Sequence, residues 1–153
     1  MTSIHTDGSQ YALLTIGHAE TPWSRGACPK NMRAARDSGQ AAALVVGTAF
    51  QAGLTGIERA THLILVGWFA DAERDVLVQH PRHLPAAQGC FALRTPVRPN
   101  PIGVSIVRLT GVDTARGRLM LDALDWFDGT PLLDIKPYYP STDMIADAQV
   151  VEP

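Results

Sequence analysis

The sequence lacks the glycine-rich motifs that identify the common cofactor- and nucleotide-binding folds. None of its 13 glycines stand two residues apart, so the G-x-G-x-x-G fingerprint and the glycine-rich loop of the commonest methyltransferases are both absent. No phosphate-binding loop is present either. The segment Gly103-Val-Ser105 does not form a nucleophile elbow, because Val107 stands where the second glycine is needed. These absences argue against a Rossmann-type core and against a serine-hydrolase site.

Cysteines, long apolar runs and excess charge are also scarce. The two cysteines, Cys28 and Cys90, lie far apart without metal-ligand spacing, which predicts free or buried thiols in a reducing cytosol. The longest apolar run, around residues 63–70, is too short to span a bilayer. Residues 1–10 are polar and carry no signal core, so we expect a cytoplasmic protein without a membrane partner. With 13 Lys+Arg against 15 Asp+Glu, any contact with nucleic acid must come from a local basic patch.

The sequence has the composition of one globular domain. It has 153 residues, 46% of them hydrophobic and 18% charged. Short β-prone runs separated by glycine and proline predict a mainly-β fold, a small barrel or sandwich with few helices. We expect a flexible tail at 1–10, a β-barrel domain at 11–143 and a C-terminal tail at 144–153. The expected strands are 11–19, 41–50, 61–69, 75–79, 90–93, 104–110, 118–124 and 132–136, with one helical turn at 32–36.

Two expected strands carry further detail. The apolar run at 61–69 indicates a strand buried on both faces, with His62 as a core histidine. Gly111 and Gly117 are expected to mark the hairpin loop before the strand at 118–124. Trp126 and the other tryptophans are expected in the core or at an interface between copies, although Trp126 is also placed to stack on a base. His80 and His83 are more typical of a solvated loop than of a metal site, since Pro81 disfavours a helix between them.

Residues 94–103 form the most constrained polar stretch. Pro96, Pro99 and Pro101 fix their own φ angles, and the residues before them are pushed toward extended conformations. The result is a stiff ribbon that holds Arg94 and Arg98 together with one amide. Rigidity combined with polarity is typical of a binding site.

A second polar cluster follows between residues 125 and 136. In the expected strand 132–136, Asp134 and Lys136 share one face. They either pair with Arg94 or Arg98 as a structural network or line a pocket beside the ribbon. The sequence leaves both interpretations open.

These two stretches carry a family resemblance. Phe-Ala-Leu-Arg-Thr-Pro-Val-Arg-Pro-Asn-Pro-Ile-Gly-Val-Ser at 91–105 and Leu-Asp-Trp-Phe-Asp-Gly-Thr-Pro-Leu-Leu-Asp-Ile-Lys-Pro-Tyr at 124–138 closely resemble the TsaA/TrmO family, which includes VirR-like proteins. Further similarity lies at 16–23 and 61–64, so the match spans about residues 14–143. The resemblance implies a β-barrel that binds S-adenosylmethionine without a Rossmann core and acts as a homodimer. It further implies methylation of N6-threonylcarbamoyladenosine beside the tRNA anticodon.

The resemblance also implies which residues bind the cofactor. Arg94 matches a cofactor-contacting arginine and Val104 an apolar contact, and the stretch 122–125 matches a further contact. Two segments depart from the common pattern: many members have Pro-Arg-Gln at 29–31 and several have His-Gln at 70–71. The expected cofactor residues are Pro29, Lys30, Asn31, Ala70, Asp71, Arg94, Val104, Asp122, Ala123, Leu124 and Asp125.

Methyl transfer to the urea-like nitrogen of threonylcarbamoyladenosine would benefit from a base or polarising group on the acceptor side. The sequence suggests Asn100, Asp128 and Lys136 for that role, and no spacing rule selects among them. Arg25, Lys30, Arg33 and Arg36 are candidates for contacts with the anticodon loop. The alternatives are a methyltransferase with a small-molecule acceptor and a non-enzymatic regulator that binds the cofactor.

Overall fold

A computed structural model describes residues 11–150 of the chain. The described part is mainly β with a few short helices, which confirms the expected class. Its strands are β1 (Gly17–Glu20), β2 (Ala42–Val46), β3 (His62–Trp68), β4 (Val78–Gln79), β5 (Gln88–Gly89), β6 (Ile102–Asp113), β7 (Arg118–Leu121) and β8 (Pro131–Pro137). Its helices are α1 (Met32–Asp37) and α2 (Pro140–Asp143), with 3-10 turns at Thr48–Leu54, Ile57–Arg59 and Cys90–Ala92.

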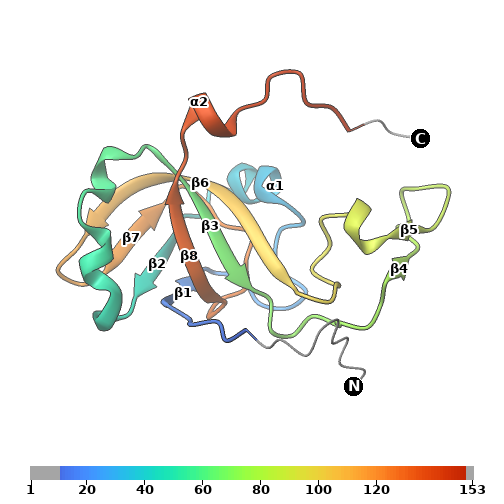
Figure 1. Ribbon diagram of the computed structural model, residues 1–153, viewed down its shortest axis with the longest axis horizontal. Coiled ribbons are helices and arrows are strands. Elements are labelled where there is room, and N and C mark those ends of the chain that lie inside the picture. The colour runs from blue at the N-terminus through green and yellow to red at the C-terminus, as the bar shows by residue number, and fades with distance from the viewer. Residues whose placement is uncertain (1–10, 151–153) are drawn as a thin grey trace.

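Six antiparallel strands close into a barrel in the order β1-β2-β7-β6-β3-β8, and β8 pairs back with β1 (Figure 1). The twelve-residue strand β6 pairs with two neighbours along different parts of its length. It pairs with β3 from Ile102 to Arg108 and with β7 only from Leu109 onward. The first half of β6 therefore has one edge that no strand covers.

The barrel core follows from the alternation of side chains along the strands. On β3, Leu63 and Leu65 point inward and are fully buried, and Val107 of β6 joins them. The outward residues of β3 are only half-buried. The expectation that β3 is buried on both faces is therefore wrong within a single chain, and His62 lies on the half-buried outer face.

Residues 70–100 leave the barrel and form a lobe of their own, which Figure 1 shows to one side of the strands. Within this 70–100 lobe, β4 and β5 pair as a separate two-stranded sheet. The strand expected at 90–93 is wrong, because Cys90–Ala92 forms a 3-10 turn instead. The Arg98 side chain donates to the carbonyls of Cys90 and Leu93, and these bonds hold the chain in the turn.

The other departures are at element ends. The first strand begins at Gly17 rather than at residue 11, and β2 ends at Val46 before a 3-10 helix. Gly111 lies inside β6 at a shift of register with β7, so only Gly117 marks the hairpin loop. Residues 144–150 are exposed and lie after the last helix, while the tail expected at 1–10 lies outside the described residues. Within 11–150, no helix is long and apolar enough to cross a membrane.

Candidate functional site

The uncovered edge of β6 is capped by two arginines instead of a strand. The Arg94 Nη2 donates to the Val104 carbonyl at 2.7 Å, and the Arg36 Nη2 donates to the Ile106 carbonyl at 2.7 Å. In an antiparallel strand, the N–H and C=O of one residue point to the same side. The N–H groups of Val104 and Ile106 therefore face the same edge as the two arginines. This edge offers backbone donors and acceptors beside an exposed guanidinium.

Segment 122–126 runs beside this edge and is fixed from three sides. The Asp122 carboxylate accepts from the Arg108 N–H at 2.9 Å and from the Arg36 Nε at 3.2 Å. The Trp23 indole donates to the Leu124 carbonyl at 2.8 Å. Asp122 is thus engaged as a brace between α1 and β6. Ala123 and Leu124 are fully buried, so they form the packed base of this segment.

Asp125 is the half-buried carboxylate of this segment. Its Oδ1 accepts from the Ser105 Oγ at 2.8 Å, which ties it to the residue that follows Val104. The Cys28 thiol lies close enough for the carboxylate to act on it. Burial, and to a lesser extent the charge of Asp125, raise the pKa of Cys28 to about 11. The thiol therefore stays protonated and inert near neutral pH.

The loop that carries Cys28 also carries the expected cofactor residues 29–31. Pro29 is half-buried, and Lys30 is exposed. Asn31 is the N-cap of α1, and its Oδ1 accepts from the Ala34 N–H at 2.9 Å. The structure therefore gives Asn31 a capping function that the sequence analysis did not identify.

The expected pair at 70–71 reaches the same loop from the end of β3. Ala70 and Asp71 are exposed. The Asp71 carboxylate lies 3.7 Å from the Arg25 guanidinium. Both of these side chains are mostly exposed, so the pair contributes little stability but does place 70–71 beside the 24–31 loop.

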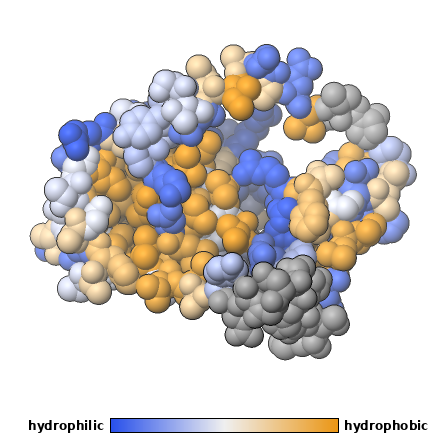
Figure 2. All heavy atoms as spheres, in the orientation of Figure 1, coloured by the Kyte–Doolittle hydropathy of each residue, from blue (hydrophilic) through white to orange (hydrophobic). Residues whose placement is uncertain are grey.

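These contacts join the expected cofactor segments around one part of the barrel. Arg94 contacts Val104, and Asp125 contacts Ser105. The charge of Asp125 acts on Cys28 of the 24–31 loop, and Arg25 of that loop pairs with Asp71. Figure 2 shows hydrophilic atoms gathered between the apolar barrel face and the 70–100 lobe. A cation, a carboxylate and a free strand edge in one place can bind a zwitterionic ligand that also bears hydroxyl groups.

The three residues suggested for the acceptor side do not converge. Asn100 is exposed just before β6, where its backbone carbonyl accepts from the Ile102 N–H. It lines a hollow of about 650 Å³ together with Trp68, Arg74 and Leu133. The Arg74 guanidinium lies 5.3 Å from the Trp68 ring centroid, at cation–π distance.

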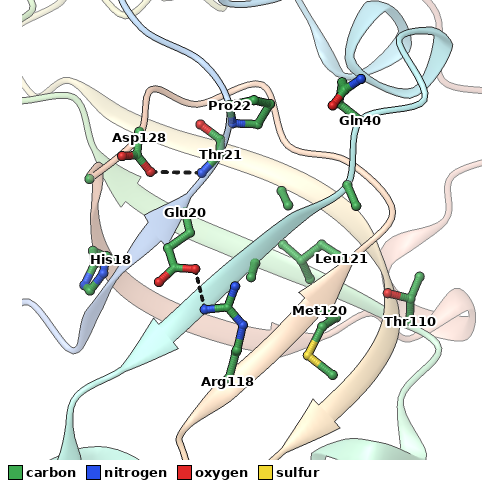
Figure 3. A pocket seen from close by; sticks show the side chains of 14 residues that line it. His18, Glu20, Thr21, Pro22, Gln40, Thr110, Arg118, Met120, Leu121 and Asp128 are labelled. Atoms are coloured by element: carbon green, nitrogen blue, oxygen red, sulfur yellow. Dashed lines mark hydrogen bonds and ion pairs between the residues drawn. The ribbon is translucent and has the colours of Figure 1, made fainter.

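Asp128 lies in a different hollow, on the outer face of β1, β2 and β7. This open groove of about 800 Å³ has alanines of β2 in its lining and an ion pair between Glu20 and Arg118 across it (Figure 3). The Asp128 Oδ1 accepts from the Thr21 N–H at 3.0 Å, a bond that fixes the turn before β8.

Lys136 lies on the outer face of β8 opposite Ile64 of β3, and Ile64 in turn lies opposite Ile106 of β6. The lysine Nζ is 2.6 Å from the Asp134 carboxylate, and within residues 11–150 neither residue forms an ion pair with Arg94 or Arg98. The hydrogen bond that Lys136 donates to the Asp134 carboxylate, and then the charge of that carboxylate, raise the pKa of Lys136. This argues against Lys136 as a general base, because a base needs the neutral amine.

The structure also shows functional groups that the sequence analysis missed or left open. Arg98 points back into its own loop, where it donates to the carbonyls of Cys90, Leu93 and Thr95. It therefore braces the segment that carries Arg94. Ser105 was not identified, although it is the one polar residue among the inward positions Gly103, Ser105 and Val107 of β6. Arg36 was named only as an RNA contact, yet it caps the edge of β6.

No group of three or more His, Cys, Asp or Glu residues in the part of the chain described here is arranged to hold a metal ion. His80 and His83 belong to the 70–100 lobe and are exposed.

Comparison with known proteins identifies the domain. A family model described as the tRNA-methyltransferase O N-terminal domain matches residues 18–144. A probable S-adenosyl-L-methionine-binding protein of Archaeoglobus fulgidus is 44% identical over 102 residues, covering 66% of this chain and 27% of that protein. The probable S-adenosyl-L-methionine-binding protein VirR of Rhizobium radiobacter is 37% identical over 127 residues, covering 82% of this chain and 70% of VirR.

Solved structures agree with this assignment. The crystal structure of TrmO from Pseudomonas aeruginosa matches with a TM-score of 0.74 and 35% identity, covering 92% of this chain and 61% of that one. A second TrmO crystal structure matches with a TM-score of 0.75 and 33% identity, covering 93% and 64%. The chain thus spans less than two thirds of these structures and of the archaeal relative. Since the family model covers most of the chain, the protein belongs to the family of the tRNA-methyltransferase O N-terminal domain.

Proposed function

We propose that this protein is an S-adenosylmethionine-dependent methyltransferase that acts on N6-threonylcarbamoyladenosine in tRNA, beside the anticodon. One observation carries the proposal. Arg94 and Asp125, far apart in the sequence, are tied to the adjacent residues Val104 and Ser105 at the uncovered edge of β6. A guanidinium and a carboxylate in this arrangement suit the two ends of the cofactor.

The residues present fit the chemistry of S-adenosylmethionine. The exposed Arg94 guanidinium suits the cofactor carboxylate, since arginine binds carboxylates through charge-assisted bonds. The Asp125 carboxylate suits the ribose hydroxyls. The N–H groups of Val104 and Ile106 offer donors to an adenine edge, while their carbonyls accept from Arg94 and Arg36. The named relatives also support this cofactor, because two of them are described as probable S-adenosyl-L-methionine-binding proteins.

The protein's contribution to the reaction is alignment. The bound cofactor supplies a methyl group on a positively charged sulfur. Arg94 and Asp125 hold opposite ends of the site against a rigid strand, and alignment of this kind lowers barriers by up to about 7–11 kcal/mol. On the acceptor side we retain Asn100, which precedes β6 at the end nearest Val104. Asp128 lies in a separate groove, and the Lys136 ammonium is paired with Asp134 on the outer face of β8.

A tRNA substrate requires cations near the site. Lys30, Arg33 and Arg94 are exposed, and no ion pair is recorded for them within residues 11–150. Exposed cations of this kind suit phosphates despite the net charge of −2. An anticodon loop is single-stranded, so its modified base is presented without melting a duplex. Such a substrate would place the protein in the cytoplasm.

The first test measures cofactor binding by calorimetry. We expect the wild-type protein to bind S-adenosylmethionine, and Arg94→Ala and Asp125→Asn each to weaken binding at least tenfold without unfolding. Arg116→Ala is the matched control, because that exposed arginine lies in the hairpin loop and pairs with Asp113. An equal loss of affinity for S-adenosylmethionine in all three variants would overturn the cofactor assignment. Absence of binding by the wild type would do the same.

The second test addresses the acceptor. Purified protein, S-adenosylmethionine and tRNA containing threonylcarbamoyladenosine are incubated, and the digested nucleosides are examined by mass spectrometry. We expect a mass gain of one methyl group on that nucleoside, and affinity for tRNA that falls steeply with salt. A protein that binds the cofactor yet leaves this nucleoside unchanged would contradict the tRNA assignment alone.

We also propose that two chains pair through the outer face of β3 and β6. Ile102, Val104 and Ile106 are 38%, 44% and 42% exposed, and each lies opposite an apolar residue of β3. Figure 2 shows apolar atoms over much of the barrel surface. An apolar strand run with one open face is typical of a surface covered by a partner, and a second copy is the simplest symmetric one.

Sedimentation is expected to show that the wild-type protein is a dimer. The Ile106→Glu variant is expected to sediment as a monomer with an unchanged fold. Met144→Glu is the control, since Met144 is also exposed but lies beyond α2. A wild-type monomer at micromolar concentration would exclude this interface.

A small-molecule acceptor is the second candidate. The Asp71 carboxylate lies beside Arg25 and offsets part of the positive charge on the 24–31 loop, which weakens the case for RNA. Tight cofactor binding together with weak, salt-insensitive binding of tRNA would favour this alternative. A cofactor-binding regulator remains the third candidate, and it is excluded by methyl transfer to any acceptor that Arg94→Ala abolishes.

A further inference from the structure

Ser105 places a hydroxyl among the apolar side chains of the barrel core. It lies on β6 opposite Leu65 of β3 and is 5% exposed. A buried hydroxyl is costly unless its hydrogen-bonding capacity is used. Within β6 its inward neighbours are Gly103 and Val107, neither of which has a polar side chain. The hydrogen-bond partners of the hydroxyl must therefore come from segments other than β6.

The Ser105 hydroxyl stands between a donor and an acceptor. The Trp126 Nε1 lies 3.0 Å from the Ser105 Oγ, and that Oγ lies 2.8 Å from the Asp125 Oδ1. An indole N–H only donates, and a serine hydroxyl has one hydrogen. The direction is therefore fixed: Trp126 donates to Ser105, and Ser105 donates to Asp125. The hydroxyl hydrogen is committed to the carboxylate.

This chain of bonds is anchored in the core at its far end. Trp126 is 1% exposed, and its ring meets the Phe69 ring edge-on at 5.8 Å between centroids. The Thr21 hydroxyl also donates to the Trp126 carbonyl at 2.8 Å. Trp126 is thus held at both its ring and its backbone, and the bond through Ser105 transmits that rigidity to Asp125.

We infer that Ser105 is a positioning residue, which orients the Asp125 carboxylate so that its second oxygen receives the ribose hydroxyls of the cofactor. The inference rests on the proposed function, because Asp125 is a ribose ligand only if S-adenosylmethionine binds here. Removal of the Ser105 hydroxyl frees the carboxylate to rotate and leaves the Trp126 N–H without its acceptor. The affinity that is lost comes from contacts with the ribose hydroxyls, while contacts with the rest of the cofactor are kept.

The experiment compares two ligands by calorimetry: S-adenosylmethionine and the analogue whose ribose lacks both hydroxyls. For the wild type we expect the analogue to bind at least tenfold more weakly. For Ser105→Ala we expect affinity for S-adenosylmethionine to fall about tenfold, while affinity for the analogue stays within twofold. Ser105→Thr retains a hydroxyl and is expected to retain the discrimination. In an Asp125→Asn background, Ser105→Ala should have little further effect on either ligand.

A matched control separates positioning from general stability. Thr130 carries another buried hydroxyl, 7% exposed, and donates to the Phe127 carbonyl at 2.7 Å. Thr130→Val should lower the melting temperature without changing the ratio of the two affinities. If Ser105→Ala weakens both ligands equally, Ser105 is merely structural and the inference is wrong. If the wild type binds both ligands equally, the inference fails while the cofactor assignment stands. If it binds neither, the proposed function fails as well.

Discussion

Gly67 of β3 lies directly opposite Gly103 of β6, and each makes room for an aromatic ring. A Cβ added at Gly67 would come within 2.6 Å of the Trp126 ring, and one added at Gly103 would overlap the Phe69 ring. Those two rings pack edge-on against each other. The paired glycines therefore accommodate the aromatic cluster that anchors Asp125 through Ser105.

Gly103→Ala is expected to destabilise the fold by about 1–3 kcal/mol, because the added methyl forces Phe69 to move in a packed interior. In a domain of this size, that corresponds to about 2–4 °C of melting temperature per kcal/mol. Gly67→Ala should act similarly through Trp126. Gly89→Ala is the control, since a Cβ there meets no atom within 4 Å. Equal melting temperatures for Gly103→Ala and Gly89→Ala would show that the rings have room to adjust.

Cys28 is expected to be unreactive near neutral pH. Its pKa is raised from 9.0 to about 11, first by burial and second by the Asp125 carboxylate. At pH 8 the thiolate fraction is then about 100-fold lower than for an unperturbed thiol, and alkylation slows accordingly. The rate should keep rising from pH 9 to pH 11, as measured by mass spectrometry of the peptide that contains Cys28.

Asp125→Asn tests the electrostatic part of this shift. Removal of the carboxylate charge should lower the pKa of Cys28 and raise its alkylation rate at pH 8, while the effect of burial persists. An alkylation rate at pH 8 equal to that of a thiol in a short peptide would contradict the placement of Cys28.

The sequence predicted the strands well where alternation or an apolar run was strong, as in β3 and β6. It failed at Cys90–Ala92, since that turn depends on Arg98 donating to local carbonyls, a contact that strand propensity does not encode. It also predicted burial of both faces of β3, because a sequence does not distinguish burial within one chain from burial between chains. In the structure, Ile64 and Val66 on the outer face of β3 are half-exposed.

The ribbon at 94–103 was predicted as a binding site from its own residues, whereas the cofactor-binding residues were predicted only through the family resemblance. Residues such as Arg94 and Asp125 are distant in sequence, and the fold brings them into contact with two adjacent residues of β6, Val104 and Ser105. The acceptor-side residues had no motif of their own, and the structure places Asn100, Asp128 and Lys136 in separate surroundings. Ser105 was missed because a single serine in a strand is usually unremarkable.

Asn31 offers a test of capping against cofactor contact. Asn31→Ala removes the acceptor for the Ala34 N–H and should lower the free energy of unfolding by about 1 kcal/mol. Asn31→Ser keeps a good N-cap but lacks the amide. We expect it to restore both stability in urea and affinity for S-adenosylmethionine. Restored stability with lost affinity would instead assign the amide to the cofactor.

Arg98 is expected to control the order of the segment that carries Arg94. Its guanidinium donates to three carbonyls, at Cys90, Leu93 and Thr95, with distances of 3.0 to 3.3 Å. Lysine has no planar fork, so Arg98→Lys cannot reproduce this set of bonds. Loss of charge-assisted bonds costs on the order of 2 kcal/mol locally. Amide hydrogen exchange across residues 90–97 should therefore accelerate in Arg98→Lys and Arg98→Ala.

The matched control is Arg82→Ala, an exposed arginine in the same 70–100 lobe. It should leave exchange in residues 90–97 unchanged, and affinity for S-adenosylmethionine as well. Arg98→Ala should weaken that affinity several-fold while leaving exchange in β3 and β8 at the wild-type rate, because the lobe pairs its own strands β4 and β5 outside the barrel. If exchange accelerated equally in β3, Arg98 would support the whole fold. Local acceleration with lost affinity would instead show that the cofactor arginine depends on the order of its own loop.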